Sequence, residues 1–134
     1  MTGRHPSKAT VLLVDDDPVI ATMYGVGLER AGYRVVVAND GRAALELASR
    51  AKPDLIILDI RMPVLDGIEV LERLTAEGLT QRTPVVMLSN RKEAGVMERA
   101  ISLGAKEYLV KLEITPPQVA AVVGRWLAAA HAEA

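Results

Sequence analysis

The chain has 134 residues, half of them hydrophobic and a quarter charged, which suits one domain with a hydrophobic core. Its formal net charge of −1 gives no electrostatic basis for binding nucleic acid, and its basic residues form pairs such as Arg91-Lys92 rather than a patch. The absence of cysteine excludes disulfides, thiolate metal sites and cysteine nucleophiles, and no apolar run approaches the roughly 20 residues that cross a bilayer.

Short apolar runs alternate with helix signals along the chain. The predicted order is strand 11–14, helix 18–31, strand 35–37, helix 41–51, strand 55–58, helix 67–77, strand 85–88, helix 91–103, strand 108–110 and helix 116–130. Continuous apolar runs are typical of parallel strands that are buried on both faces. The alternation therefore predicts an α/β fold, with a doubly wound five-stranded parallel sheet flanked by five helices.

Capping signals mark several of the predicted helix ends. Asp17 precedes a proline at the first helical position, which is typical of an N-cap. Pairs with capping-box spacing are Asp66 with Glu69, Asn90 with Glu93, and Thr115 with Gln118. Glycines at which helices are expected to end in a left-handed residue are Gly32, Gly78 and Gly104. Because Asn90 is the better cap for the fourth helix, Ser89 is predicted to be free for chemistry.

We interpret residues 1–134 as one domain, with an N-terminal tail over 1–9, a folded core over 10–130 and a C-terminal tail over 131–134. The polar N-terminus does not have the pattern of a signal peptide, which favours a cytoplasmic location without a membrane partner. The two histidines, His5 and His131, fall in these tails, where neither is expected to belong to an organised site.

Polar residues follow the ends of four predicted strands. Asp15 and Asp16 follow the first strand and Asp59 follows the third, while Ser89 closes the fourth and Lys111 follows the fifth. Because the carboxyl ends of parallel strands meet at one edge of a sheet, these side chains should converge on a single crevice. Taken alone, each has an ordinary explanation as a loop or surface residue.

The chemistry of this set indicates phosphoryl transfer. Clustered carboxylates repel one another unless a cation neutralises them, and hard oxygen ligands without histidine or cysteine favour Mg²⁺. A carboxylate beside Mg²⁺ is a competent nucleophile toward phosphorus, so it can form an aspartyl phosphate. Lys111 would neutralise phosphoryl oxygens and the Ser89 hydroxyl would donate a hydrogen bond to another. Tyr108 and Trp126 are more simply explained as packing residues.

At these residues the pattern resembles the receiver domains of two-component response regulators. The motifs are Val-Asp-Asp at 14–16, Asp-Leu-Ile-Ile-Leu-Asp at 54–59, Met-Pro-Val-Leu-Asp-Gly at 62–67, Pro-Val-Val-Met-Leu-Ser at 84–89 and Gly-Ala-Lys-Glu-Tyr-Leu-Val-Lys at 104–111. Each motif is weak, but all five with matching spacing are specific. The resemblance extends from Val11 to about Leu127 and implies a flavodoxin-like fold with strand order 2-1-3-4-5.

The resemblance also implies roles for individual residues. Asp59 is the expected phosphoacceptor, with Lys111 as the phosphate partner and Ser89 and Tyr108 as the switch pair. The expected ligands of Mg²⁺ are Asp15, Asp16, Asp59 and the backbone carbonyl of Arg61. The phosphoryl group would come from a histidine kinase or a histidine phosphotransfer protein, and the response would pass to a downstream protein target. A weak homodimer through the fourth and fifth helices is a further expectation.

Two residues depart from the family pattern. Leu112 stands where the family usually has a proline joined to the lysine by a cis peptide, so the loop that carries Lys111 can take a different path. Asn90 stands where a small residue is more common, next to the acceptor pocket, and is expected to affect the access of water to the phosphate. Both departures concern kinetics and phosphate lifetime more than the identity of the domain.

Other functions fit the sequence less well. An aspartyl-phosphate phosphohydrolase would have a second aspartate two positions after the nucleophile, where this chain has Arg61, so we expect no enzyme activity beyond the chain's own phosphorylation and dephosphorylation. No Gly-x-Gly-x-x-Gly follows the first strand, which argues against dinucleotide binding. A phosphorylation-independent pseudo-receiver that serves as a protein-interaction module is the main alternative. We expect a stand-alone regulator, with a receiver cut from a longer regulator as the alternative.

Overall fold

The computed structural model describes residues 8–62 and 64–132. The predicted N-terminal tail over 1–9 falls largely outside this part of the chain, as do the last two residues of the predicted tail over 131–134. The strands are β1 (Thr10–Val14), β2 (Arg34–Ala38), β3 (Leu55–Leu58), β4 (Val85–Ser89) and β5 (Glu107–Val110). The α-helices are α1 (Pro18–Arg30), α2 (Gly41–Arg50), α3 (Gly67–Ala76), α4 (Ala94–Ser102) and α5 (Pro116–Ala132), and two short 3₁₀ turns are η1 (Leu79–Gln81) and η2 (Lys111–Glu113).

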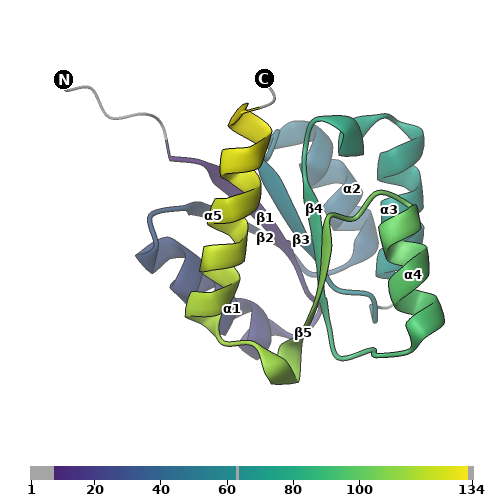
Figure 1. Cartoon of the computed structure of the whole chain (residues 1–134), viewed down its shortest axis with the longest axis horizontal. Coiled ribbons are helices and arrows are strands. Elements are labelled where there is room, and N and C mark those ends of the chain that lie inside the picture. Colours follow the sequence, from purple (N-terminus) through teal and green to yellow (C-terminus); the bar gives the residue numbers. More distant parts are fainter. Residues whose placement is uncertain (1–7, 63, 133–134) are drawn as a thin grey trace.

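The five strands form one parallel sheet in the order β2-β1-β3-β4-β5, which confirms the predicted topology. Helices α1 and α5 cover one face, and α2, α3 and α4 cover the other (Figure 1). Successive strand residues point to opposite faces, so the continuous apolar runs supply two cores at once. Leu12, Ile56 and Met87 pack under α2, α3 and α4, while Leu13, Ile57 and Leu88 pack under α1 and α5.

Most of the predicted caps are present. The Asp17 carboxylate accepts hydrogen bonds from the first turn of α1, and Asp66 with Glu69 forms a reciprocal capping box at the start of α3. Thr115 and Gln118 bond each other's backbone N–H groups in the same way. The three glycines that follow helices all have positive φ, at 102° for Gly32, 79° for Gly78 and 116° for Gly104.

The predicted cap of the fourth helix is wrong. Helix α4 begins at Ala94 rather than at 91, and its N-terminus has no side-chain cap. Both predicted capping residues are engaged elsewhere: the Asn90 Oδ1 accepts the N–H of Leu112 at 3.1 Å, and the Glu93 carboxylate pairs with the Arg91 guanidinium at 2.9 Å. The segment 90–93 is therefore a loop that faces the turn after β5.

Trp126 packs as expected on the sheet face that α1 and α5 cover, and its indole Nε1 donates to the Glu107 Oε1 at 2.7 Å. Among residues 8–62 and 64–132 no helix has the length and apolar character needed to cross a membrane.

The strand register determines which residues meet at the carboxyl edge of the sheet. Val14 of β1 is paired with Leu58 of β3, so the next residues, Asp15 and Asp59, leave the sheet side by side. Ser89 is paired with Val110, so Lys111 emerges next to the end of β4. The register thus brings together residues that are up to 96 positions apart, between Asp15 and Lys111.

Candidate functional site

Three carboxylates converge at the carboxyl edge of the sheet. Asp15 and Asp59 are buried, Asp16 is exposed, and one oxygen from each lies within 4.8 Å of the others. Backbone groups orient the two buried side chains, because the Asp15 Oδ1 accepts the N–H of Asp17 at 2.9 Å and the Asp59 Oδ1 accepts the N–H of Ile60 at 2.8 Å. One oxygen of each buried carboxylate is thereby held in place.

Lys111 bridges the remaining oxygens of the buried carboxylates. Its Nζ lies 2.7 Å from the Asp15 Oδ2 and 3.0 Å from the Asp59 Oδ2. Burial acts to lower the pKa of Lys111, but the hydrogen bonds that its ammonium donates to Asp15 and Asp59 outweigh burial and raise the pKa above its ordinary value. The lysine is therefore a permanent cation at the site.

The charge of the cluster favours a divalent cation. Three carboxylates and one ammonium group carry a formal net charge of −2 in a largely buried setting. Hard carboxylate oxygens at this spacing are the donor set that Mg²⁺ uses, with positions left for water and a phosphate. Asp15, Asp16 and Asp59 are thus the residues that could hold the ion.

Ser89 and Tyr108 are connected through the backbone of one residue, Arg91. The buried Ser89 Oγ accepts the N–H of Arg91 at 3.2 Å, and the half-buried Tyr108 hydroxyl donates to the Arg91 carbonyl at 2.7 Å. Burial raises the pKa of Tyr108, so its hydroxyl stays protonated and remains a donor at neutral pH. Ser89 and Tyr108 thus both hold the backbone of Arg91, one at its N–H and the other at its carbonyl.

An open cleft of about 440 Å³ joins these groups, and it is lined by Asp16, Asp17, Ile20, Met23, Tyr24, Asp59, Arg61, Ser89, Asn90, Arg91, Lys111 and Leu112. The predicted site residues Asp16, Asp59, Ser89, Arg61 and Lys111 all lie on it, and Asp15 reaches it through Lys111. Tyr108 does not line the cleft but contacts the loop 90–93, because its hydroxyl donates to the Arg91 carbonyl.

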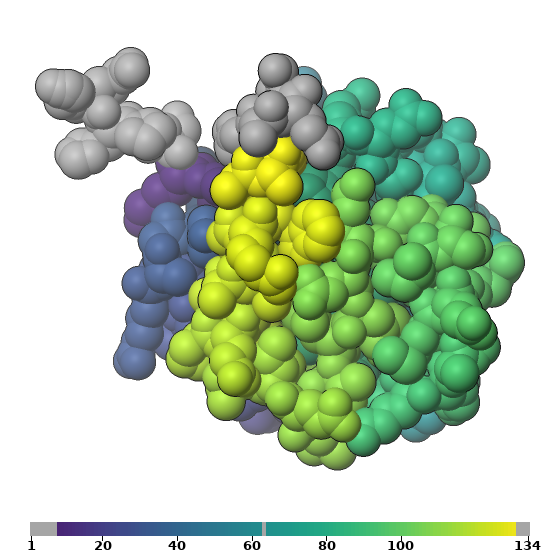
Figure 2. All heavy atoms as spheres, in the orientation of Figure 1, coloured from purple at the N-terminus to yellow at the C-terminus, as the bar shows by residue number. Residues whose placement is uncertain are grey.

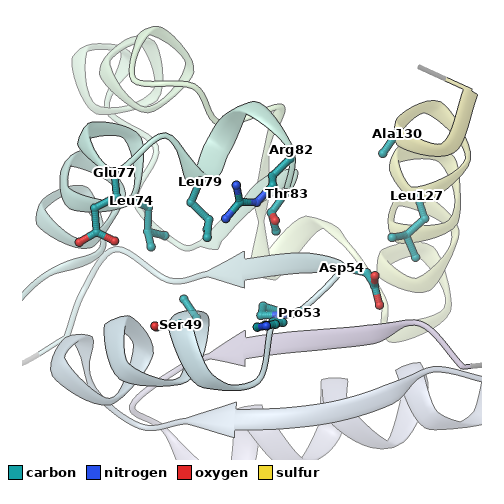
Figure 3. A pocket seen from close by; sticks show the side chains of 12 residues that line it. Ser49, Pro53, Asp54, Leu74, Glu77, Leu79, Arg82, Thr83, Leu127 and Ala130 are labelled. Atoms are coloured by element: carbon teal, nitrogen blue, oxygen red, sulfur yellow. The ribbon is translucent and has the colours of Figure 1, made fainter. Parts of the chain in front are cut away.

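A larger cavity, of about 580 Å³, lies at the opposite edge of the sheet, between the ends of α2, α3 and α5 (Figure 3). Asp54, which directly precedes β3, is one of the lining residues. The Asp54 Oδ2 accepts the N–H of Thr10 at 2.7 Å. None of the predicted site residues lines this cavity.

One residue that lines the cleft and one that packs against Asp59 are not marked as functional by the sequence. Tyr24 belongs to the buried face of α1, and helical spacing alone marks it only as a core residue. Gly67 appears in the sequence only as the end of the 62–67 motif and the start of a predicted helix, but a Cβ at this position would lie 2.0 Å from the carbonyl oxygen of Asp59. The loop after β3 therefore folds directly onto Asp59, and only glycine allows that approach.

Comparison with known proteins agrees with this geometry. The family model of the response regulator receiver domain matches residues 11–123, and the chain belongs to this family. Among curated relatives, the alkaline phosphatase synthesis transcriptional regulatory protein PhoP of Bacillus subtilis is 43% identical over 101 residues, covering 75% of this chain and 41% of that protein. The transcriptional regulatory protein PrrA of Mycobacterium leprae is 40% identical over 116 residues, covering 87% and 49%. The chain thus spans less than half the length of these relatives.

Solved receiver domains share the fold. The chemotaxis protein CheY4 of Vibrio cholerae superposes with a TM-score of 0.81 and 34% identity, covering 89% of this chain and 98% of that one. A CheY-like receiver domain protein of Methanospirillum hungatei superposes with a TM-score of 0.88 and 25% identity, covering 96% and 100%. The chain is therefore a receiver domain of the two-component response-regulator class.

Proposed function

We propose that this receiver accepts a phosphoryl group on Asp59 from a histidine kinase or a histidine phosphotransfer protein. The observation that carries the proposal is the buried arrangement in which Lys111 bridges Asp15 and Asp59, with Asp16 in reach of the same ion position. A structural ion pair would not need a third carboxylate beside an open cleft. A nucleophile, a phosphate partner and metal ligands need all four residues.

Asp15, Asp16 and Asp59, together with the backbone carbonyl of Arg61, would hold Mg²⁺. The ion would neutralise charge on the phosphoryl oxygens. The other steps belong to the chain's own residues. An oxygen of Asp59 forms a bond to phosphorus while the P–N bond of the donor's phosphohistidine breaks, and the electron pair stays on the imidazole nitrogen. Lys111 exchanges a carboxylate partner for a phosphoryl oxygen, and the Ser89 hydroxyl donates to another.

The new phosphoryl group would act through the contacts of Arg91. It adds roughly two negative charges and three acceptor oxygens next to Ser89. Attraction of Ser89 to these oxygens displaces the Arg91 backbone, which weakens the hydrogen bond that holds the Tyr108 hydroxyl. Helix α4, strand β5 and helix α5 form one continuous face above this loop (Figure 2), and we propose that a downstream protein or a second receiver binds there.

The proposed activity is limited to phosphorylation and dephosphorylation of the chain itself, in the cytoplasm. The curated relatives are named as transcriptional regulators, and the matched region covers 41% and 49% of them, so we do not extend that activity to this domain. The cleft rim carries exposed apolar side chains, with Met23 at 43% and Leu112 at 83% exposure. These side chains provide a surface for the protein that donates the phosphoryl group.

Mg²⁺ should raise the midpoint of thermal unfolding, because an ion that binds only the folded state stabilises it by about 2.7 kcal/mol at 100 times its Kd. Asp16 is exposed, so Asp16→Asn removes a ligand without disturbing the core and should abolish most of the increment. Glu98→Gln, which removes an exposed charge on α4, is the matched control and should retain it. Beryllofluoride, a phosphate mimic, should add a second increment that requires both Mg²⁺ and the Asp59 carboxylate. Equal increments in native protein and Asp16→Asn would contradict the assigned ligands.

A further inference from the structure

The turn that carries Lys111 is held from two sides by residues outside the acceptor set. This turn, η2 with Ile114 after it, follows β5 directly, and the Lys111–Leu112 peptide bond within it is trans. From the α1 side, the Tyr24 hydroxyl lies 3.4 Å from the carbonyl oxygen of Lys111 and 3.3 Å from that of Ile114. From the other side, the Asn90 Oδ1 accepts the N–H of Leu112 at 3.1 Å.

Tyr24 is built into the core at 2% exposure, so its hydroxyl is presented to the turn by a rigid helix. Burial raises the pKa of this hydroxyl, which keeps it protonated and able to donate. The two carbonyl oxygens belong to the first residue of the turn and to the residue just after it. A single donor placed between these two carbonyl oxygens restrains both ends of the turn.

Asn90 closes the turn against the loop that follows Ser89. The bond depends on the backbone N–H of Leu112, which a proline at that position would lack. A second contact joins the same two segments, because the Lys92 ammonium pairs with the Glu113 carboxylate. The two residues that depart from the family pattern, Asn90 and Leu112, are therefore partners in one hydrogen bond.

We infer that Tyr24 and Asn90 are positioning residues that set the place of the Lys111 ammonium, and through it the rate at which Asp59 accepts a phosphoryl group. This inference rests on the proposed function. The Lys111 side chain has to reach Asp15 and Asp59 from a turn outside the sheet, and small displacements of a charged partner in a buried site are costly to reactivity. A turn fixed at its carbonyls by Tyr24 and at its N–H by Asn90 has little freedom to shift.

The test compares Tyr24→Phe and Asn90→Ala with native protein in the full chain. Tyr24→Phe keeps the ring and removes only the hydroxyl, and Asn90 is exposed, so its variant does not depend on the core. Tyr33→Phe is the matched control: Tyr33 packs against the same core cluster, and its hydroxyl makes no hydrogen bond to residues 111–114 in the described part of the chain. Each variant is assayed for its phosphorylation rate with acetyl phosphate, for beryllofluoride affinity and for Mg²⁺ affinity.

We expect Tyr24→Phe and Asn90→Ala each to lower the phosphorylation rate and the beryllofluoride affinity about three- to tenfold, the usual size of one lost hydrogen bond. Mg²⁺ affinity should stay within about twofold, because the carboxylates are untouched. In a Lys111→Met background the same substitutions should have no further effect, since their action passes through the lysine. Unchanged rates in both variants, or equal losses in the Lys111→Met background, would overturn the inference.

A separate readout needs no phosphate. The ¹⁵N signal of the Lys111 ammonium in the free protein should shift or broaden in Tyr24→Phe and stay unchanged in Tyr33→Phe. If the native chain bound no phosphate mimic while this signal still shifted, the proposed function would fail and the positioning of Lys111 would stand. An ammonium signal unaffected by Tyr24→Phe would count against the positioning role itself.

Discussion

Lys111→Met should lower the rate of phosphorylation by acetyl phosphate by about 10²-fold, the usual loss when one group that stabilises transition-state charge is removed. Lys111 provides the ammonium group that lies between Asp15 and Asp59, so the variant loses the charge that a phosphoryl group would meet. The measurement is the initial rate of phosphoprotein formation at saturating Mg²⁺.

Lys106→Met is the control for this experiment. Lys106 is exposed and lies just before β5, away from the cleft, so its variant should retain the native rate. Lys111→Arg keeps the charge but replaces a compact ammonium with a planar guanidinium, and should recover only part of the activity. A native rate in Lys111→Met would remove the lysine from the proposed mechanism.

Gly67→Ala should lower the free energy of unfolding by about 3 kcal/mol or more, at the upper end of overpacking effects. The added Cβ would lie 2.0 Å from the carbonyl oxygen of Asp59 and 2.8 Å from the Cα of Ile60, and neither is a flexible side chain that can move aside. The N–H of Gly67 also donates to the Ile60 carbonyl at 2.8 Å, so the loop cannot retreat without losing that bond. Urea denaturation of the two proteins measures the difference.

Gly95→Ala separates this clash from the general effect of replacing a glycine. Gly95 lies in α4, and a Cβ there meets nothing within 4 Å. Alanine is favoured over glycine in a helix by about 0.5–1 kcal/mol, so this variant should be slightly more stable than the native chain. If Gly67→Ala were as stable as the native protein, the loop after β3 would not lie against Asp59 as described.

Apolar runs predicted the sheet well, because strands buried on both faces leave an unambiguous pattern. Leu55–Leu58 of β3 begins and ends where predicted, and every predicted strand is present with its bounds changed by one residue at most. The carboxyl-edge rule then located the site, because parallel strands place Asp15, Asp59 and Lys111 at one edge regardless of their distance in the sequence.

Contacts between loops were not predictable in this way. Asn90 has a helix-capping partner three residues later in the sequence, and local spacing does not reveal that the N–H of Leu112 competes for the same oxygen. Helix α4 begins at Ala94, later than predicted, while both expected capping side chains are engaged elsewhere. Tyr24 has the same limitation, since its hydroxyl partners follow it by 87 and 90 residues and no periodic pattern connects them. Such bonds depend on how segments that are far apart in the sequence meet in space.

Intact-mass spectrometry after incubation with acetyl phosphate tests whether Asp59 is a Mg²⁺-dependent phosphoacceptor. We expect one added phosphoryl group on the native chain, absent without Mg²⁺ and absent in Asp59→Asn. Beryllofluoride binding, followed in parallel, distinguishes rapid hydrolysis of the phosphate from failure to form it. A native chain that gained no mass and did not bind beryllofluoride would contradict the phosphoacceptor role of Asp59, and the domain would then be interpreted as a receiver that acts only through protein contacts.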